Sequence, residues 1–297
     1  MKILRAIGKS LCYFMVYFTL QGIATGAALV FKIPEMIKNG VFDAFKDGGP
    51  LTQKEKTDFI NSFLNAIVDV TMPAMIVSAV LTILLYILSS RLKGRKFSEE
   101  VRLGKPSLIA LPAVILFGAS INILISYALS LLESQGSMKH FFEDYENATS
   151  FLNVEISVIS VLAVAVFGPI VEEILFRGYI YGSFREAFSG KVTKVIIPMI
   201  IQGVVFAFAH GSVIGLIYTF PLGIIMALIL DRFDSLYMSM AFHMAFNATS
   251  FADTLLNGLE GAPLIIVLSV CTVVALASMF LIWFGKYEKK PKTPANA

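Results

Sequence analysis

Residues 151–181 read FLNVEISVISVLAVAVFGPIVEEILFRGYIY, an apolar stretch long enough to cross a bilayer as one helix. The stretch lacks the alternation of apolar and polar residues that a membrane strand would need. It nevertheless carries two adjacent carboxylates, Glu172 and Glu173, and an arginine, Arg177. Ionisable groups are costly inside lipid, so the stretch predicts a transmembrane helix whose charged residues have a specific role.

Seven further apolar runs divide the rest of the chain. The 297 residues are 57% hydrophobic and 15% charged, with a mean hydropathy of +0.77, whereas soluble domains carry about 25% charged residues. Lipid offers no partners to backbone groups, so runs without alternation favour helices. The sequence therefore predicts an all-α, polytopic membrane bundle of about eight transmembrane helices, at residues 11–31, 63–89, 108–132, 151–181, 195–212, 213–231, 236–255 and 263–283.

The charges in the loops predict the orientation of these helices. Basic residues gather before residue 11 and in segments 91–105, 185–194 and 286–292, whereas segment 133–150 is acidic. With eight spans, all four basic segments fall on one side, which the positive-inside rule assigns to the cytoplasm. We therefore expect a multi-pass membrane protein with both termini cytoplasmic, in the cell membrane if the source is a prokaryote. We expect the long first loop, residues 32–62, to carry a short amphipathic helix on the outer surface.

Composition also limits the partners and the cofactors. The net charge is only +3, and the basic residues lie in short loops rather than on one face, so the expected partner is the lipid bilayer and not nucleic acid. Cys12 and Cys271 lie in apolar runs without a CxxC or Cys/His spacing, which favours simple packing. Glycine pairs at GxxxG spacing predict close helix contacts at Gly22/Gly26, Gly178/Gly182 and Gly211/Gly215.

Spacing within the fourth run separates the two glutamates. Glu173 and Arg177 are four residues apart with the acid first, the favoured order for a helical ion pair. Glu172 is turned by roughly 100° around the helix, so it is free of that pair and becomes the candidate working carboxylate. Pro169 cannot donate to the carbonyl of Ala165 and should bend or loosen the helix before the acids. A purely architectural polar cluster would fit this segment equally well.

Two of the three histidines also lie in apolar runs. Phe206 and His210 are four apart in the fifth run, and His243 and Asn247 are four apart in the seventh, so each pair shares a helix face. With Glu172 they form a set of one carboxylate, two imidazoles and one amide. Such a set could hold a water that Glu172 deprotonates, with an imidazole or the amide stabilising an oxyanion. It could instead bind a divalent metal such as zinc.

These residues form three motifs, EExxxR, FxxxH and HxxxN, on separate apolar runs and in this order. In that respect the chain resembles the type II CAAX prenyl protease family, also called the CAAX-protease and bacteriocin-processing (CPBP, Abi) family. The resemblance covers about residues 158–253. The motifs are Glu172-Glu173-x-x-x-Arg177, Phe206-x-x-x-His210 and His243-x-x-x-Asn247.

The resemblance implies an intramembrane endopeptidase acting on membrane-associated or apolar peptides, with lipid-modified ones among the candidates. It assigns residues 1–150 to N-terminal helices and loops, 151–255 to the catalytic core, and 256–297 to a last helix and a basic tail. The cofactor is either zinc or none. By carry-over, Glu172 is the general base, His210, His243 and Asn247 hold the attacking water or, with Glu172, a metal, and Glu173, Arg177 and Phe206 support the site.

Two other classes of function stay open at this point. One is a non-proteolytic regulator that binds a membrane signalling partner, and the other is a proton-coupled transporter that uses the paired carboxylates. Depth in the membrane is a further test of the site. His243 lies about seven residues, roughly 10 Å, into its helix from the inner side, and His210 about 15 residues into its own. The two can meet only if the helices tilt or if the fifth helix starts later than residue 195.

Overall fold

The computed structural model of the chain describes residues 1–46, 48–136, 138–149, 156–252 and 258–287. Residues 151–155 of the fourth expected run, residues 253–255 of the seventh, and the tail lysines after Lys286 therefore lie outside the described residues. Within these ranges every regular element is a helix and there is no strand, so the all-α prediction is confirmed.

Six helices are long and apolar enough to cross a membrane, which makes the chain a multi-pass integral membrane protein. The other two expected spans form shorter helices, α9 (Thr193–Phe208) and α11 (Leu236–Ser250), of 16 and 15 residues. The total of eight spans therefore stays a prediction. The six are α1 (Lys2–Lys38), α2 (Gln53–Leu92), α4 (Leu111–Ser134), the segmented helix Val158–Ala187, α10 (Val213–Phe233) and α13 (Gly261–Phe284).

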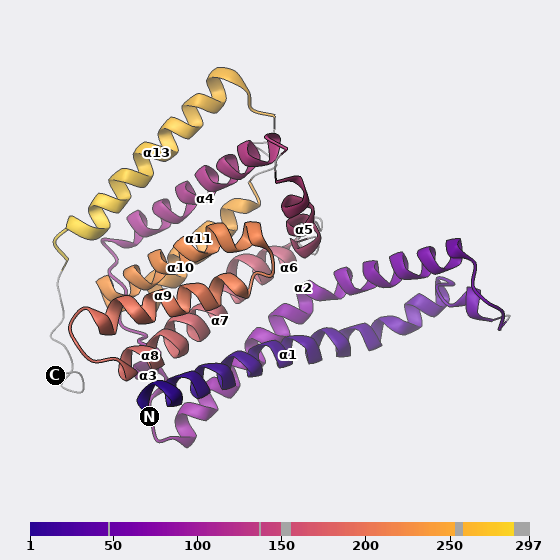
Figure 1. Ribbon diagram of the computed structural model, residues 1–297, viewed down its shortest axis with the longest axis horizontal. Coiled ribbons are helices and arrows are strands. Elements are labelled where there is room, and N and C mark those ends of the chain that lie inside the picture. Colours follow the sequence, from indigo (N-terminus) through magenta and orange to yellow (C-terminus); the bar gives the residue numbers. More distant parts are fainter. Residues whose placement is uncertain (47, 137, 150–155, 253–257, 288–297) are drawn as a thin grey trace.

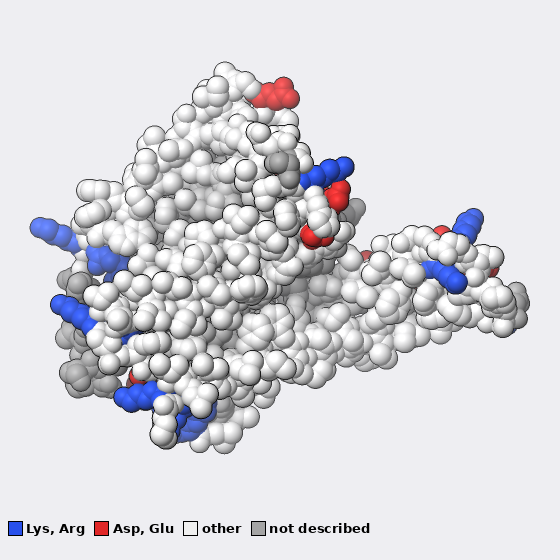
Figure 2. All heavy atoms as spheres, viewed as in Figure 1, with Lys and Arg blue, Asp and Glu red and all other residues white. Residues whose placement is uncertain are grey.

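Charge is distributed as a membrane protein requires. The start of α1 and the end of α13 lie at the same end of the molecule (Figure 1). On the face shown in Figure 2, lysines and arginines gather at that end, and acidic residues gather near α5 (Lys139–Thr149) and the start of α13. The surface between the two ends is almost uncharged, which suits a lipid-facing band. The assignment of the basic end to the cytoplasm stays a prediction.

Helices α1 and α2 form a hairpin that projects well beyond the rest of the bundle (Figure 1). They have 37 and 40 residues, about 55 and 60 Å of helix, against a hydrocarbon core of about 30 Å. The expected long first loop is thus mostly helical continuation, and the regular structure described between the two helices, outside residue 47, is a 3₁₀ turn at Asp43–Phe45. The reason is local: Thr52 and Glu55 form a reciprocal capping box that begins α2 well before its apolar part.

The fourth run is a single helix in five segments at the centre of the bundle, in contact with α1, α2, α9, α10 and α11. Pro169 was expected to loosen it, and the turn before Pro169 is π-helical. A second π-helical segment follows the glutamates, so both acids lie between two widened stretches. The segments are α6 (Val158–Val161), η3 (Leu162–Phe167), α7 (Gly168–Glu173), η4 (Ile174–Tyr181) and α8 (Gly182–Ala187).

Helices α4 and α11 cross closely. A methyl group on Gly118 of α4 would lie 2.4 Å from the carbonyl oxygen of Phe242, the residue before His243. The GxxxG prediction was largely wrong, because Gly22, Gly26, Gly182 and Gly211 have no neighbour that such a methyl group would meet. Spacing shows that two glycines share a face, but not that this face meets another helix. Gly178 does have a close neighbour, Val101.

Gly118→Ala should therefore displace α11 and the site residues that it carries. We expect the free energy of unfolding to fall by about 1–3 kcal/mol, the usual cost of overpacking, with a lower midpoint in a thermal unfolding assay in detergent. Gly22→Ala is the matched control, because its methyl group would point into open space. Equal midpoints for the two variants would show that the α4–α11 crossing can relax without cost.

A polar clamp joins the segment after α3 (Phe97–Glu100) to the turn between α10 and α11. Arg102 donates to Asp231 and Asp234, both at 2.7 Å, and its carbonyl accepts from the Leu236 amide at 2.9 Å. Tyr181 of η4 donates to the same Asp231 at 2.5 Å. The start of α11 is therefore fixed against the central helix at the basic end of the molecule.

Candidate active site

Glu173 is the hub of the polar cluster inside the bundle. Its side chain is 0% exposed, and its Oε1 lies 2.9 Å from Nη1 of Arg177, so the ion pair expected from the four-residue spacing is present. The same oxygen accepts from Nδ1 of His243 at 2.9 Å, and Oε2 accepts a short hydrogen bond from the hydroxyl of Ser239. A carboxylate can be buried without water only when it has such partners.

Arg177 completes this ion pair from a fully buried position. Its guanidinium carbon lies 4.2 Å from the ring centre of Phe206, in the geometry of a cation–π contact. Its N–H groups are not aligned along any hydrogen bond to the described residues. The attraction between opposite charges, and not a directed hydrogen bond, therefore holds the pair. A methyl group on Gly223 of α10 would lie 3.0 Å from Cα of Gly203 and in ordinary contact with Phe206 and Nη2 of Arg177, at 3.5 and 3.7 Å, so this glycine lets α9 and α10 pack closely beside the pair.

Phe206 links the three elements of the site. Its ring packs edge to face against His210, with centres 4.7 Å apart, and against His243 at 5.9 Å. One face of the ring meets Arg177. The phenyl ring therefore lies between the Glu173–Arg177 pair and the imidazole of His210, and it also borders the imidazole of His243.

His210 lies just beyond α9 and not inside a helix as expected. The helix ends at Phe208, Gly211 adopts a left-handed conformation with φ of +70°, and Ser212 caps α10 by accepting from the Gly215 amide. Nδ1 of His210 lies 2.8 Å from the carbonyl oxygen of Phe206. A carbonyl only accepts, so Nδ1 carries the proton and neutral His210 keeps Nε2 as an acceptor.

Glu172 is the exposed member of the acidic pair. Its side chain is 22% exposed, and its Oε2 lies 3.7 Å from Nε2 of His243. His243 thus faces one glutamate with each ring nitrogen. The sequence predicts different membrane depths for His210 and His243. The two imidazoles nevertheless lie near the same phenyl ring, although α9 begins at Thr193, no later than predicted. Both imidazoles border Phe206 because the short α9 ends beside α11.

Asn247 lies one turn beyond His243 and contacts the central helix at a different point. Its Nδ2 donates to the carbonyl oxygen of Val164 at 2.9 Å. In the π-helical spacing of η3, that carbonyl would pair with the nitrogen of residue 169, which is a proline without an N–H. Asn247 therefore supplies the donor that Pro169 lacks, and this contact fixes which way its amide points.

The sequence reasoning missed Ser239 and Gly223. Ser239 lies four residues before His243, and that shared helix face was the signal that could have found it. Gly223 stands alone in an apolar run, and nothing in its local sequence indicates that an arginine from another helix lies against it.

The donor set does not fit a metal ion well. No group of three or more His, Cys, Asp or Glu side chains comes together as a metal site anywhere in the described ranges. Nδ1 of both histidines is engaged, by Glu173 and by the Phe206 carbonyl, which still leaves each Nε2 able to act as a ligand, but the Asn247 amide is turned to Val164. We therefore derive no step through zinc.

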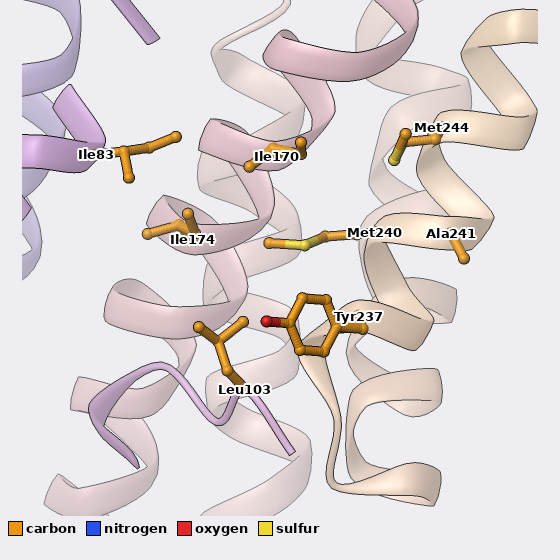
Figure 3. Close-up of a pocket in the computed structure, with 8 residues that line it drawn as sticks. All are labelled: Ile83, Leu103, Ile170, Ile174, Tyr237, Met240, Ala241 and Met244. Carbon is orange, nitrogen blue, oxygen red and sulfur yellow. The ribbon is translucent and has the colours of Figure 1, made fainter. Parts of the chain in front are cut away.

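An apolar pocket lies on another side of the central helix. Figure 3 shows side chains from α2, α7, η4 and α11 converging on it, with Met240 and Met244 from the helix that carries His243. Its volume is about 320 Å³, and its other lining residues are Ile83, Leu103, Ile170, Ile174, Tyr237 and Ala241. Ile170 precedes Glu172 by two residues, a rotation of roughly 200°, so the pocket does not open on the Glu172 carboxylate.

Residues 154–249 match the protein family described as type II CAAX prenyl endopeptidase Rce1-like. The match covers about a third of the chain and includes all three motifs. No curated protein and no solved structure matches the chain significantly.

Proposed function

We propose, from the membership of residues 154–249 in the CAAX protease family, that the chain hydrolyses peptide bonds through a water activated by Glu172. The family supports a CAAX-type intramembrane endopeptidase in general terms. The residue roles are our proposal. The observation that carries them is the contrast between two adjacent glutamates: Glu173 is fully buried, paired with Arg177 and hydrogen-bonded by His243 and Ser239, whereas Glu172 is partly exposed and faces an imidazole nitrogen.

Which nitrogen of each histidine carries the proton indicates the role of that ring in the reaction. Nδ1 of His243 faces the Glu173 carboxylate and Nδ1 of His210 faces a carbonyl, so each neutral ring presents Nε2 as an acceptor. A nitrogen that only accepts hydrogen bonds cannot stabilise an oxyanion, but it can orient a water molecule by accepting a hydrogen bond from it. A water has two protons, so we assign one to a hydrogen bond with an imidazole Nε2, which positions the water, and the other to transfer to Glu172.

Bond making and breaking then balance as follows. The water oxygen attacks the carbonyl carbon of the scissile peptide bond while its proton moves to Glu172. The second N–H of the Asn247 amide is the candidate donor to the resulting oxyanion. When the C–N bond breaks, Glu172 returns the proton to the departing amine. The products are a carboxylic acid, which keeps the second proton of the water, and an amine; the acid then protonates the amine to give a carboxylate and an ammonium group, and Glu172 is again ionised.

The site lies among apolar helices, so a substrate has to reach it at or within the membrane. The substrate is therefore a peptide or protein segment located there. Both unmodified apolar segments and lipid-modified ones fit this description. The apolar pocket beside Met240 and Met244 is open to a hydrocarbon group, but its position away from Glu172 assigns it no part in bond cleavage.

The test compares protein termini in membranes of cells that carry the wild-type chain or Glu172→Gln at matched expression, by mass spectrometry. We expect new N- and C-termini in wild-type membranes that vanish in the variant, and these would name the substrate. Identical termini, with both proteins folded and abundant, would overturn the proteolytic function and favour a regulator that binds a membrane partner.

A further inference from the structure

The hydroxyl of Ser239 contacts two other helices. Thr71, Thr219 and Thr249 each donate to the carbonyl four residues earlier in their own helix, the usual way to satisfy a hydroxyl in lipid, whereas Ser90 lies 2.6 Å from Oε2 of Glu100 as well as near its own helix carbonyl. Ser239 instead lies between helices. It donates to Oε2 of Glu173 on the central helix, and its Oγ also lies 3.2 Å from the Met226 carbonyl of α10.

The carboxylate is the acceptor that takes the Ser239 proton. A hydroxyl has one proton, and a charged acceptor forms the shorter and stronger hydrogen bond. The contact with Glu173 is the shorter of the two, and both side chains are 0% exposed, so no water competes for it. Ser239 is therefore the donor to Oε2, while Oε1 receives Arg177 and His243.

This division of donors fixes the plane of the carboxylate. With Oε1 and Oε2 each held, Glu173 cannot rotate about its last side-chain bond. Its Oε1 then stays aimed at Nδ1 of His243, which must carry a proton because an ionised carboxylate only accepts. Ser239 and His243 are one helical turn apart on α11, so one face of this helix meets both oxygens of Glu173.

We infer that Ser239 is a positioning residue of the site: through Glu173 it keeps His243 protonated on Nδ1, with Nε2 directed at Glu172. The inference rests on the proposed function for its catalytic meaning. Ser239 touches neither Glu172 nor the space where the water would lie, and it stands outside all three motifs. Without its hydroxyl, the Glu173 carboxylate can turn, and the imidazole can exchange tautomers or tilt away from Glu172.

The test uses three replacements at this position. Ser239→Ala removes the hydroxyl without adding volume. Ser239→Thr and Ser239→Val are matched in shape, and only Thr keeps the hydroxyl, so their difference isolates the hydrogen bond from any packing cost. The chain has only three histidines, so ring ¹⁵N signals in uniformly histidine-labelled protein can be assigned by single substitutions.

At one fixed pH we expect wild type and Ser239→Thr to show His243 as a single Nδ1-protonated tautomer, and Ser239→Ala and Ser239→Val to show a mixture. In cleavage assays kcat should fall by up to about 100-fold in Ala and Val, with KM nearly unchanged, because a misplaced group costs turnover rather than binding. An unchanged tautomer in both Ala and Val would overturn the inference. The ring signals do not depend on activity, so they decide the role of Ser239 even if the proteolytic function fails.

Discussion

Glu172→Gln is expected to abolish cleavage by the purified protein, with kcat reduced by about 10²–10⁴-fold, the range that a general base supplies. Glutamine keeps the shape and can still hydrogen-bond, but it cannot take a proton from water. The side chain is 22% exposed and takes no part in the Glu173–Arg177 pair, so the folded state loses little. The measurement is the initial rate of cleavage of a substrate found in membranes, beside a thermal unfolding curve.

Glu186→Gln is the matched control for this variant. Glu186 lies exposed on α8 at the end of the same segmented helix, so its replacement makes the same chemical change away from the cluster. We expect its kcat to stay within about threefold of wild type, since surface changes away from such features have small effects. A Glu172→Gln protein that turns over at the wild-type rate would remove Glu172 from the chemistry.

The features that the sequence predicts well are local ones. The Glu173–Arg177 pair follows from a four-residue spacing within one helix, and the π-helical stretch before the acids follows from the missing N–H of Pro169. Both depend on residues less than two turns apart. The all-α class follows equally directly, because lipid leaves apolar runs few other ways to satisfy their backbones.

The features that the sequence does not predict depend on how segments far apart in the chain pack against each other. The close crossing of α4 and α11, Gly118 against Phe242, joins residues of different helices, and no spacing within either helix indicates it. The dipeptide Gly211-Ser212 is compatible with two different local structures. The spacing Gly211/Gly215 predicts a GxxxG packing face, whereas Gly211 adopts a left-handed conformation and Ser212 caps the start of α10. That turn, and not a helix, presents His210.

Arg177→Ala is expected to have the largest effect on stability of any single change in the site. It would leave the Glu173 carboxylate with only the neutral donors Ser239 and His243 among the described residues, at a position that is 0% exposed. Breaking a buried pair by removing one partner costs about 3–5 kcal/mol, and the cation–π contact with Phe206 is lost as well. We expect a lower unfolding midpoint and lower abundance in the membrane, with activity falling in parallel.

A second substitution separates charge from packing at this pair. In Arg177→Ala/Glu173→Gln the unpaired charge is gone, and the glutamine oxygen can still accept from His243 while its NH2 group donates to the Ser239 hydroxyl oxygen. We therefore expect the double variant to be more stable than Arg177→Ala, while cleavage stays low because His243 no longer faces a carboxylate. If Arg177→Ala alone were as abundant and as stable as wild type yet could not turn over substrate, Arg177 would act in the chemistry itself, and the division between Glu172 as the working acid and Glu173–Arg177 as its support would be wrong.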